Sequence, residues 1–119
     1  MELETGSLTT LEWVGIVLAA ITGVVHLVIS TGFLPEPLGI SFLLAGLGFL
    51  GAIVLVLLGY RRRTVYAVGI PYTAVQIVLW YVLNFDGVSD MLETAGPLGV
   101  LDKAVQIAFV LVLIALLRR

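Results

Sequence analysis

Apolar residues fill four long windows of the chain, and nearly all of the charged residues lie in the short stretches between them. The windows are residues 11–34, 38–60, 64–84 and 98–117. A helix needs about 20 residues to cross ~30 Å of hydrocarbon. Inside lipid, the backbone polar groups of such a segment must hydrogen-bond to one another. The pattern therefore predicts four transmembrane helices in a single membrane domain, residues 1–119.

The connections between the windows are short. Pro35-Glu36-Pro37 predicts a tight turn after the first window, because proline cannot continue a helix. Arg61-Arg62-Arg63 joins the second and third windows, and residues 85–97 form the longest link. Short links place consecutive helices antiparallel and side by side. We therefore expect an all-α, four-helix transmembrane bundle with up-down-up-down order.

The composition excludes most soluble classes of protein. Hydrophobic residues make up 61% of the chain, charged residues 12%, and the mean hydropathy is +1.17. Soluble domains carry about 25% charged residues. The net charge of −2 argues against nucleic acid as a partner, since phosphate binding needs clustered Lys and Arg. The chain has no cysteine and one histidine, so we expect no metal site, no cofactor and no enzymatic activity.

The positive charges indicate an orientation in the cell (plasma) membrane. With four spans, both termini and the Arg61-Arg62-Arg63 link share one face, which holds five arginines, whereas the opposite face holds only Lys103. Short loops rich in Lys and Arg stay in the cytoplasm, so we expect the N- and C-termini inside. The three linked arginines act in this interpretation as a topology signal. The alternative is a clamp for an anionic lipid headgroup or a phosphate.

Polar residues inside the spans are the candidates for function, because burying them in lipid is costly. The set comprises His26, Gln76, Asp102, Lys103 and Gln106. Thr22, His26 and Ser30 are four residues apart and share one helix face. At 1.5 Å per residue, the three helices bring these polar groups to a similar depth in the outer half of the bilayer. We therefore expect one polar cluster there.

Two interpretations of this cluster stay open. It is either a small outward-facing pocket with a titratable centre at His26, or an internal hydrogen-bond network that fixes helix register. In the second interpretation, Lys103 snorkels toward the surface and pairs with Asp102.

Two further features concern helix shape and packing. Pro71 lies near the middle of the third window and predicts a kink, which is either a gating hinge or a packing feature. Small residues recur every three or four positions in the second window, at Ser41, Ala45, Gly48 and Ala52. Such spacing lets helix backbones approach closely. It leaves open whether the partner helix belongs to the same chain.

Three stretches carry a resemblance to a known family: residues 21–27 (ITGVVHL), 37–50 (PLGISFLLAGLGFL) and 69–76 (GIPYTAVQ). The chain resembles a family of uncharacterised small four-span membrane proteins from halophilic archaea, over nearly its whole length. The resemblance implies a four-helix integral membrane protein with no assigned activity. It also implies that His26, Pro71, Tyr72 and Gln76 are family features, without giving them a role.

These observations lead to a first functional expectation. The chain is a non-enzymatic integral membrane protein that acts by assembly, as a homo-oligomer or as an accessory subunit of another membrane protein. Its partners are the lipid bilayer and a second membrane-embedded chain. The alternative is a small transporter or channel with an outer-leaflet polar site around His26, Gln76 and Gln106. A third possibility, a haem or enzyme site at His26, has no second signature in the sequence.

Overall fold

The computed structural model describes residues 3–119 and is helical, with no strand in that part of the chain. Four long helices are apolar enough to cross a membrane: α1 (Thr10–Ser30), α2 (Pro37–Leu57), α3 (Arg62–Asn84) and α5 (Pro97–Leu117). A 3-10 turn, η1 (Thr5–Ser7), precedes α1, and a short helix, α4 (Val88–Thr94), connects α3 to α5. The predicted all-α fold with four candidate spans is confirmed. The length and apolar composition of these helices are those of a multi-pass membrane protein.

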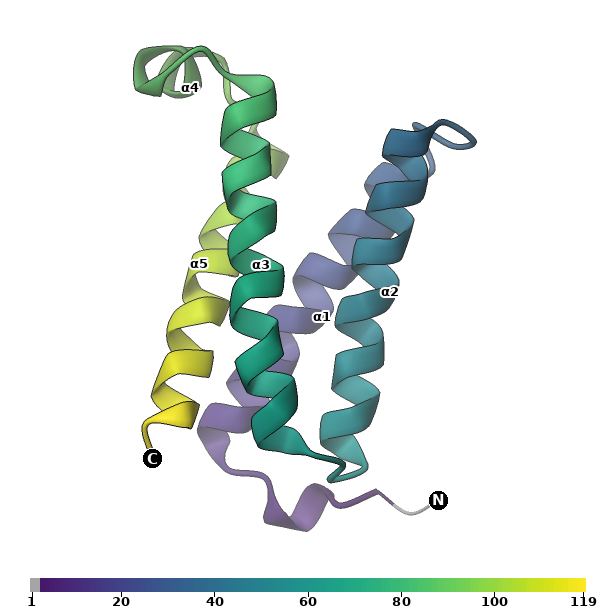
Figure 1. The fold of residues 1–119 in the computed structure, drawn as a ribbon, viewed down its shortest axis with the longest axis vertical. Coiled ribbons are helices and arrows are strands. Elements are labelled where there is room, and N and C mark those ends of the chain that lie inside the picture. Colours follow the sequence, from purple (N-terminus) through teal and green to yellow (C-terminus); the bar gives the residue numbers. More distant parts are fainter. Residues whose placement is uncertain (1–2) are drawn as a thin grey trace.

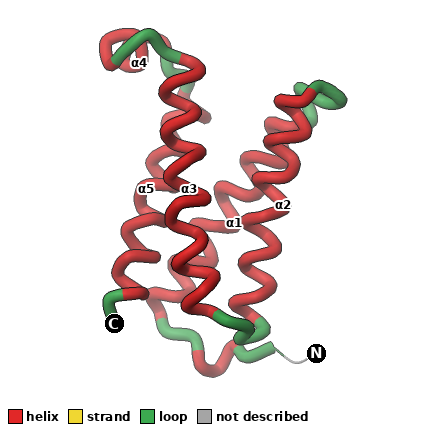
Figure 2. The backbone as a smooth tube through the Cα atoms, in the orientation of Figure 1, coloured by secondary structure: helices red, strands yellow, loops and turns green. Residues whose placement is uncertain are grey.

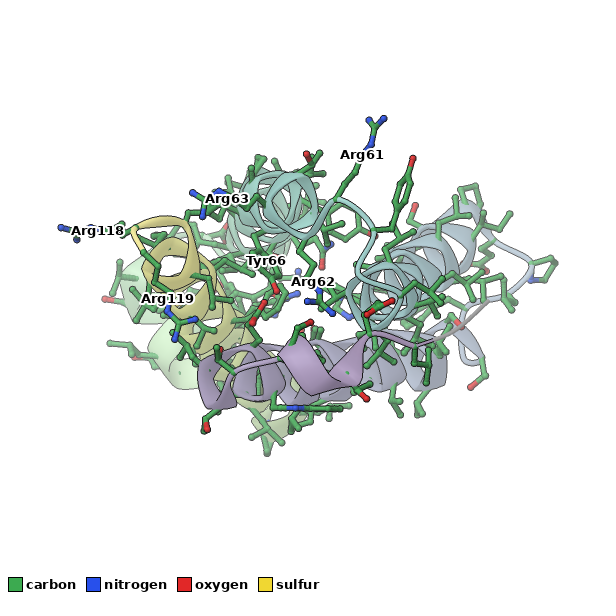
Figure 3. All side chains as sticks on the ribbon, turned by 90° about the horizontal axis from the view of Figure 1, so that it is seen from below. Arg61, Arg62, Arg63, Tyr66, Arg118 and Arg119 are labelled. Carbon is green, nitrogen blue, oxygen red and sulfur yellow. The ribbon has the colours of Figure 1, made fainter. Side chains whose placement is uncertain are left out.

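Consecutive long helices run antiparallel, so η1 and the C-terminus lie at the same end of the bundle (Figure 1). That end also carries Arg61, Arg62, Arg63, Arg118 and Arg119 (Figure 3), and we call it the Arg-rich end. The opposite end is the α4 end. The side of the membrane that each end faces stays a prediction.

Two helix ends differ from the predicted windows. The first window was expected to reach residue 34, but α1 ends at Ser30. The hydroxyls of Ser30 and Thr31 donate to the carbonyls of Leu27 and Val28, at 2.6 and 2.7 Å, as the chain leaves the helix. The second window was expected to reach residue 60, but α2 ends at Leu57. Gly59 follows with a φ of 71°, a left-handed conformation that no α-helix continues.

The packing order of the helices differs from their order along the chain. α1 packs against both α2 and α5, and α3 packs against α5. α2 and α3 follow one another in the sequence, yet they touch at few positions and separate toward the α4 end (Figure 2). α2 and α3 are antiparallel neighbours as expected, but they pack less closely than α1 with α2 or α3 with α5.

Tyr72 explains how α2 and α3 are spaced. Its side chain, on α3, lies over Gly48 of α2, and its hydroxyl donates to the carbonyl of Ala45 at 2.9 Å. A phenol ring between two helices holds their axes apart, so the small residues of α2 at this level receive an aromatic side chain. The close backbone approach occurs instead between α1 and α2, where a Cβ on Gly46 would lie 2.8 Å from the carbonyl oxygen of Gly23.

The apolar core lies in the half of the bundle near the Arg-rich end. It contains residues of all four long helices: Ala19, Phe49, Val56, Tyr66, Phe109, Leu113 and Leu116. The ring of Phe49 meets those of Tyr72 and Phe109 edge-on, with centroids 5.2 and 5.9 Å apart. α3 runs as one helix through Pro71, whose side chain is exposed, so the proline does not end the helix and the kink stays a prediction.

Candidate functional site: a buried polar network of three helices

Thr22 of α1 connects two helices through its hydroxyl. It donates to Asp102 Oδ1 of α5 at 2.7 Å and accepts from Gln106 Nε2 of α5 at 3.2 Å. Thr22 and Gln106 are completely buried, and Asp102 is nearly so. A hydroxyl can donate one hydrogen bond and accept two, so Thr22 serves a carboxylate and an amide at the same time.

Lys103 neutralises the buried carboxylate. Its Nζ donates to Asp102 Oδ2 at 2.9 Å and to Gln106 Oε1 at 2.7 Å, and it lies 5.9 Å from the centre of the Trp80 ring. A buried ion pair is tolerated only when further hydrogen bonds satisfy both ions. Here the carboxylate has two donors, and the ammonium has two acceptors and an aromatic face.

Gln76 ties α3 to the same group. Its Oε1 accepts from Gln106 Nε2 at 2.8 Å, across the interface between α3 and α5. Gln106 therefore donates to both α1 and α3 through one amide nitrogen while its carbonyl oxygen accepts from Lys103. The network thus holds α1, α3 and α5 in one register.

His26 joins the network through Thr22, whose hydroxyl oxygen lies 3.4 Å from His26 Nδ1. The same Nδ1 is 2.7 Å from the carbonyl oxygen of Thr22 on the same helix. Because a carbonyl only accepts, this contact assigns the proton to Nδ1. The ring lies 5.9 and 5.8 Å from those of Phe42 and Phe49 of α2. His26 therefore bridges the polar network and the aromatic packing between α1 and α2.

The structure brings all five predicted cluster residues into one hydrogen-bonded group. Gln76, Asp102, Lys103 and Gln106 contact one another, and His26 is attached through Thr22. The predicted set left out Thr22, which makes the link from α1, and Trp80, which covers Lys103. The sequence spacing could have indicated both Thr22 and Trp80 as members of the cluster. Thr22 precedes His26 by one helical turn, and Trp80 follows Gln76 by one turn.

Thr73 is a further buried polar residue that the predicted cluster did not include. It lies on α3, one turn from Gln76 toward the Arg-rich end, and is completely buried. Within residues 3–119 its hydroxyl has no hydrogen-bond partner. In the same part of the chain, no three His, Asp or Glu side chains gather closely enough to hold a metal ion.

The three linked arginines at the Arg-rich end have different surroundings. Arg62 donates to the carbonyls of Val56 and Glu4 at 2.8 and 2.6 Å and to the Ser7 hydroxyl at 2.7 Å. This guanidinium fastens η1 to α2. Arg63 donates to the Leu117 carbonyl at 2.8 Å, near the last turn of α5. Arg61 lies over the Tyr60 ring, 5.4 Å from its centre, and points away from the bundle (Figure 3).

The interior near the Arg-rich end contains a cavity of about 50 Å3, lined by residues of all four long helices. Most of its walls are apolar, and its polar side chains are Glu12, Tyr66 and Tyr72. Glu12 and Tyr66 contact each other, because the phenol donates to Glu12 Oε2. The other oxygen of Glu12 accepts from the Thr9 backbone N–H in a capping box at the start of α1. This pair links the beginning of α1 to α3.

A second space is an open groove of about 600 Å3 between α2 and α3. It contains the small residues Gly48, Gly51, Ala52 and Gly69, and it ends near Tyr60 and Arg61. None of the polar network residues lines this groove or the cavity.

Comparisons with known proteins place the chain in a family without assigning it an activity. A family model matches residues 2–117, and its description is a family of unknown function. No curated protein and no solved structure matches the chain. The expectation of an uncharacterised family is confirmed, whereas the halophilic archaeal source implied by the resemblance stays a prediction.

Proposed function

We propose that this chain, which belongs to the DUF7475 family of unknown function, is a non-enzymatic membrane protein that acts by assembly. The proposed assembly is a homo-oligomer within the plane of the cell membrane, in which a second copy packs against the side formed by α2 and α3.

One observation carries this proposal: the four spans are unequally buried inside a single chain. One third of the residues in the α1 and α5 spans are buried, against 17% in α2 and 11% in α3. Helix association in lipid is driven by packing and by hydrogen bonds between helices. α1 and α5 each pack closely against two helices of the chain, whereas α2 packs mainly against α1 and α3 mainly against α5. α2 and α3 therefore present most of their surface outward.

The polar network supports a structural role. The carboxylate of Asp102, the ammonium of Lys103 and the amide of Gln106 all have partners within the chain. A network satisfied in this way sets helix register and rigidifies the bundle. These contacts favour an internal hydrogen-bond network over an outward-facing pocket.

The transport alternative is less well supported. It needs a polar route from the network to the Arg-rich end, but the intervening cavity is lined mainly by apolar side chains such as Phe49, Phe109 and Leu113. If the protein is a transporter, the variants Gln76→Ala and His26→Ala should abolish flux into liposomes. Under the assembly proposal, the two variants and the wild type should give the same flux into liposomes.

Single-cysteine cross-linking in the bilayer tests which side is the interface, and the chain supplies a clean background because it has no cysteine. We expect Leu47→Cys on α2 and Val75→Cys on α3 to form cross-linked dimers with a short thiol reagent. The matched controls are Val24→Cys on α1 and Leu111→Cys on α5. All four positions are exposed to similar degrees, between 50 and 61%.

Equal cross-linking at all four positions would indicate random collision, and its absence at all four would indicate a monomer. Either result contradicts the proposal. Cross-linking to a different protein in native membranes, with no dimer, would replace the homo-oligomer with the accessory-subunit interpretation.

A further inference from the structure

We propose that the groove between α2 and α3 binds one anionic phospholipid, with an acyl chain lying along the groove and the phosphate held by Arg61. The proposal concerns the interior of the α2–α3 side and does not depend on the homo-oligomer proposed above.

The dimensions of the groove match one leaflet of a bilayer. Along α3 it extends from Arg61 at the Arg-rich end to Tyr72 near the middle of the span. Eleven residues of helix rise about 17 Å, roughly half of the ~30 Å hydrocarbon thickness. An acyl chain that starts at the headgroup level of Arg61 therefore reaches the level of Tyr72 near the bilayer midplane.

The groove adjoins the interior cavity of the bundle. It shares five lining residues with the interior cavity: Gly48, Ala52, Val65, Gly69 and Tyr72. A Cβ built on Gly51 would meet nothing within 4 Å, so the α2 wall of the groove is open at that position. In a membrane an apolar groove of this kind is filled by hydrocarbon, and its side opening gives a lipid chain direct access.

The charge at the end of the groove favours a phosphate. Arg61 is the only charged side chain among its described lining residues, and no carboxylate lies there to compete. The guanidinium groups of Arg62 and Arg63 donate to carbonyl groups of the protein. Within residues 3–119 the Arg61 guanidinium makes no hydrogen bond and lies over the Tyr60 ring. The exposed hydroxyl of Thr64 lines the groove one turn further along α3. A guanidinium and a hydroxyl are suitable donors to phosphate oxygens.

The same charge disfavours a second copy of the chain inside the groove. A second copy seated inside the groove about a two-fold axis along the membrane normal would bring both copies of Arg61 close together at the same height, where the two guanidinium groups repel each other. Contact through the outer surfaces of α2 and α3 does not require that approach. A phospholipid brings the opposite charge to Arg61. The groove is therefore better suited to a lipid, and the outer surfaces of α2 and α3 remain available for protein contacts.

Native mass spectrometry of the protein released from nanodiscs tests the proposal. The nanodiscs contain equimolar phosphatidylglycerol and phosphatidylcholine of identical chains. We expect the wild-type chain to retain one phosphatidylglycerol in preference to phosphatidylcholine. Arg61→Gln should weaken this preference roughly fivefold, the effect of removing one basic residue at an anionic surface.

One further test variant, Gly51→Leu, has a control for added bulk, and Arg61→Gln has a control for the general charge of that end. Arg118→Gln removes the same charge from an arginine that points away from the bundle at the end of α5 (Figure 3), and should keep the preference. Gly51→Leu fills the groove, where its side chain meets no atom at the Cβ, and should remove retained lipid of both kinds. Ala104→Leu adds bulk at an exposed position of α5 and should change nothing.

Three outcomes would overturn the lipid site. They are equal loss of preference in Arg61→Gln and Arg118→Gln, retention of both lipids to the same extent by the wild type, and lipid retention that survives Gly51→Leu. Release of a second protein chain in place of lipid from the wild type, lost in Gly51→Leu, would assign the groove to a protein partner instead.

Discussion

At the scale of single residues, the structure depends on polar side chains that satisfy each other inside an apolar bundle. Thr22 is the clearest case, since its one hydroxyl serves both Asp102 and Gln106. Sequence reasoning placed Gln76, Gln106 and the Asp102–Lys103 pair at a common depth, because helical rise fixes depth. It missed Thr22 as the junction, because a threonine is a weak polar signal and its partners are 80 and 84 residues away in the chain.

Replacement of this junction should be measurable as a loss of stability. Thr22→Val removes the hydroxyl and leaves Asp102 Oδ1 without its donor on α1. Leaving a buried polar group unpaired costs about 1–3 kcal/mol, so we expect unfolding in mixed detergent micelles to become easier by that amount. Thr31→Val is the control, because its exposed hydroxyl contacts only the Val28 carbonyl. Equal effects of the two substitutions would contradict a special role for Thr22.

The Asp102–Lys103 ion pair gives a second prediction at this scale, because each of the two buried charges neutralises the other. Lys103→Met should destabilise the protein by about 3–5 kcal/mol, since it leaves a carboxylate buried without a counter-charge. The double variant Asp102→Asn with Lys103→Met removes both charges and should recover a large part of that loss. The double-mutant cycle is measured by the same unfolding assay. Additive losses would show that the two side chains do not interact.

At the scale of helices and links, hydropathy predicted which segments cross the membrane but not where each helix ends. The thickness of the bilayer sets a span of about 20 residues, which is why all four windows contain a helix. The ends of α1 and α2 depend instead on local details that hydropathy does not record. Ser30 and Thr31 bond back to the preceding turn, and Gly59 takes a left-handed conformation.

The contact between Arg62 and η1 is an element-scale feature that can be tested by itself. Arg62 holds Glu4 and Ser7, and the Glu4 amide donates to the Leu57 carbonyl at 2.7 Å. Arg62→Gln should release this segment from α2 and increase hydrogen exchange at the Glu4 amide. Arg61→Gln removes the same charge from the next residue and should leave that exchange unchanged. Protection that survives Arg62→Gln would show that the backbone bond alone holds the segment.

At the scale of the whole molecule, the packing order of the helices creates the surfaces on which both proposals rest. α1 and α5 are far apart in sequence but pack together, and they receive α2 and α3 on their flanks. Hydropathy could not predict this order, because a polytopic sequence gives similar apolar signals for inner and outer helices. The groove between α2 and α3 is a consequence of that order and of Tyr72, so it became visible only in three dimensions.

The central claim is that this small membrane protein works as an assembly of its own copies. The most direct measurement is the protein mass of the complex extracted with its surrounding bilayer in a polymer nanodisc, without exposure to detergent. We predict a discrete species that contains two or more chains of 12.8 kDa each, at protein-to-lipid ratios low enough to exclude chance co-occupancy. A uniform population of single chains at those ratios would contradict the claim.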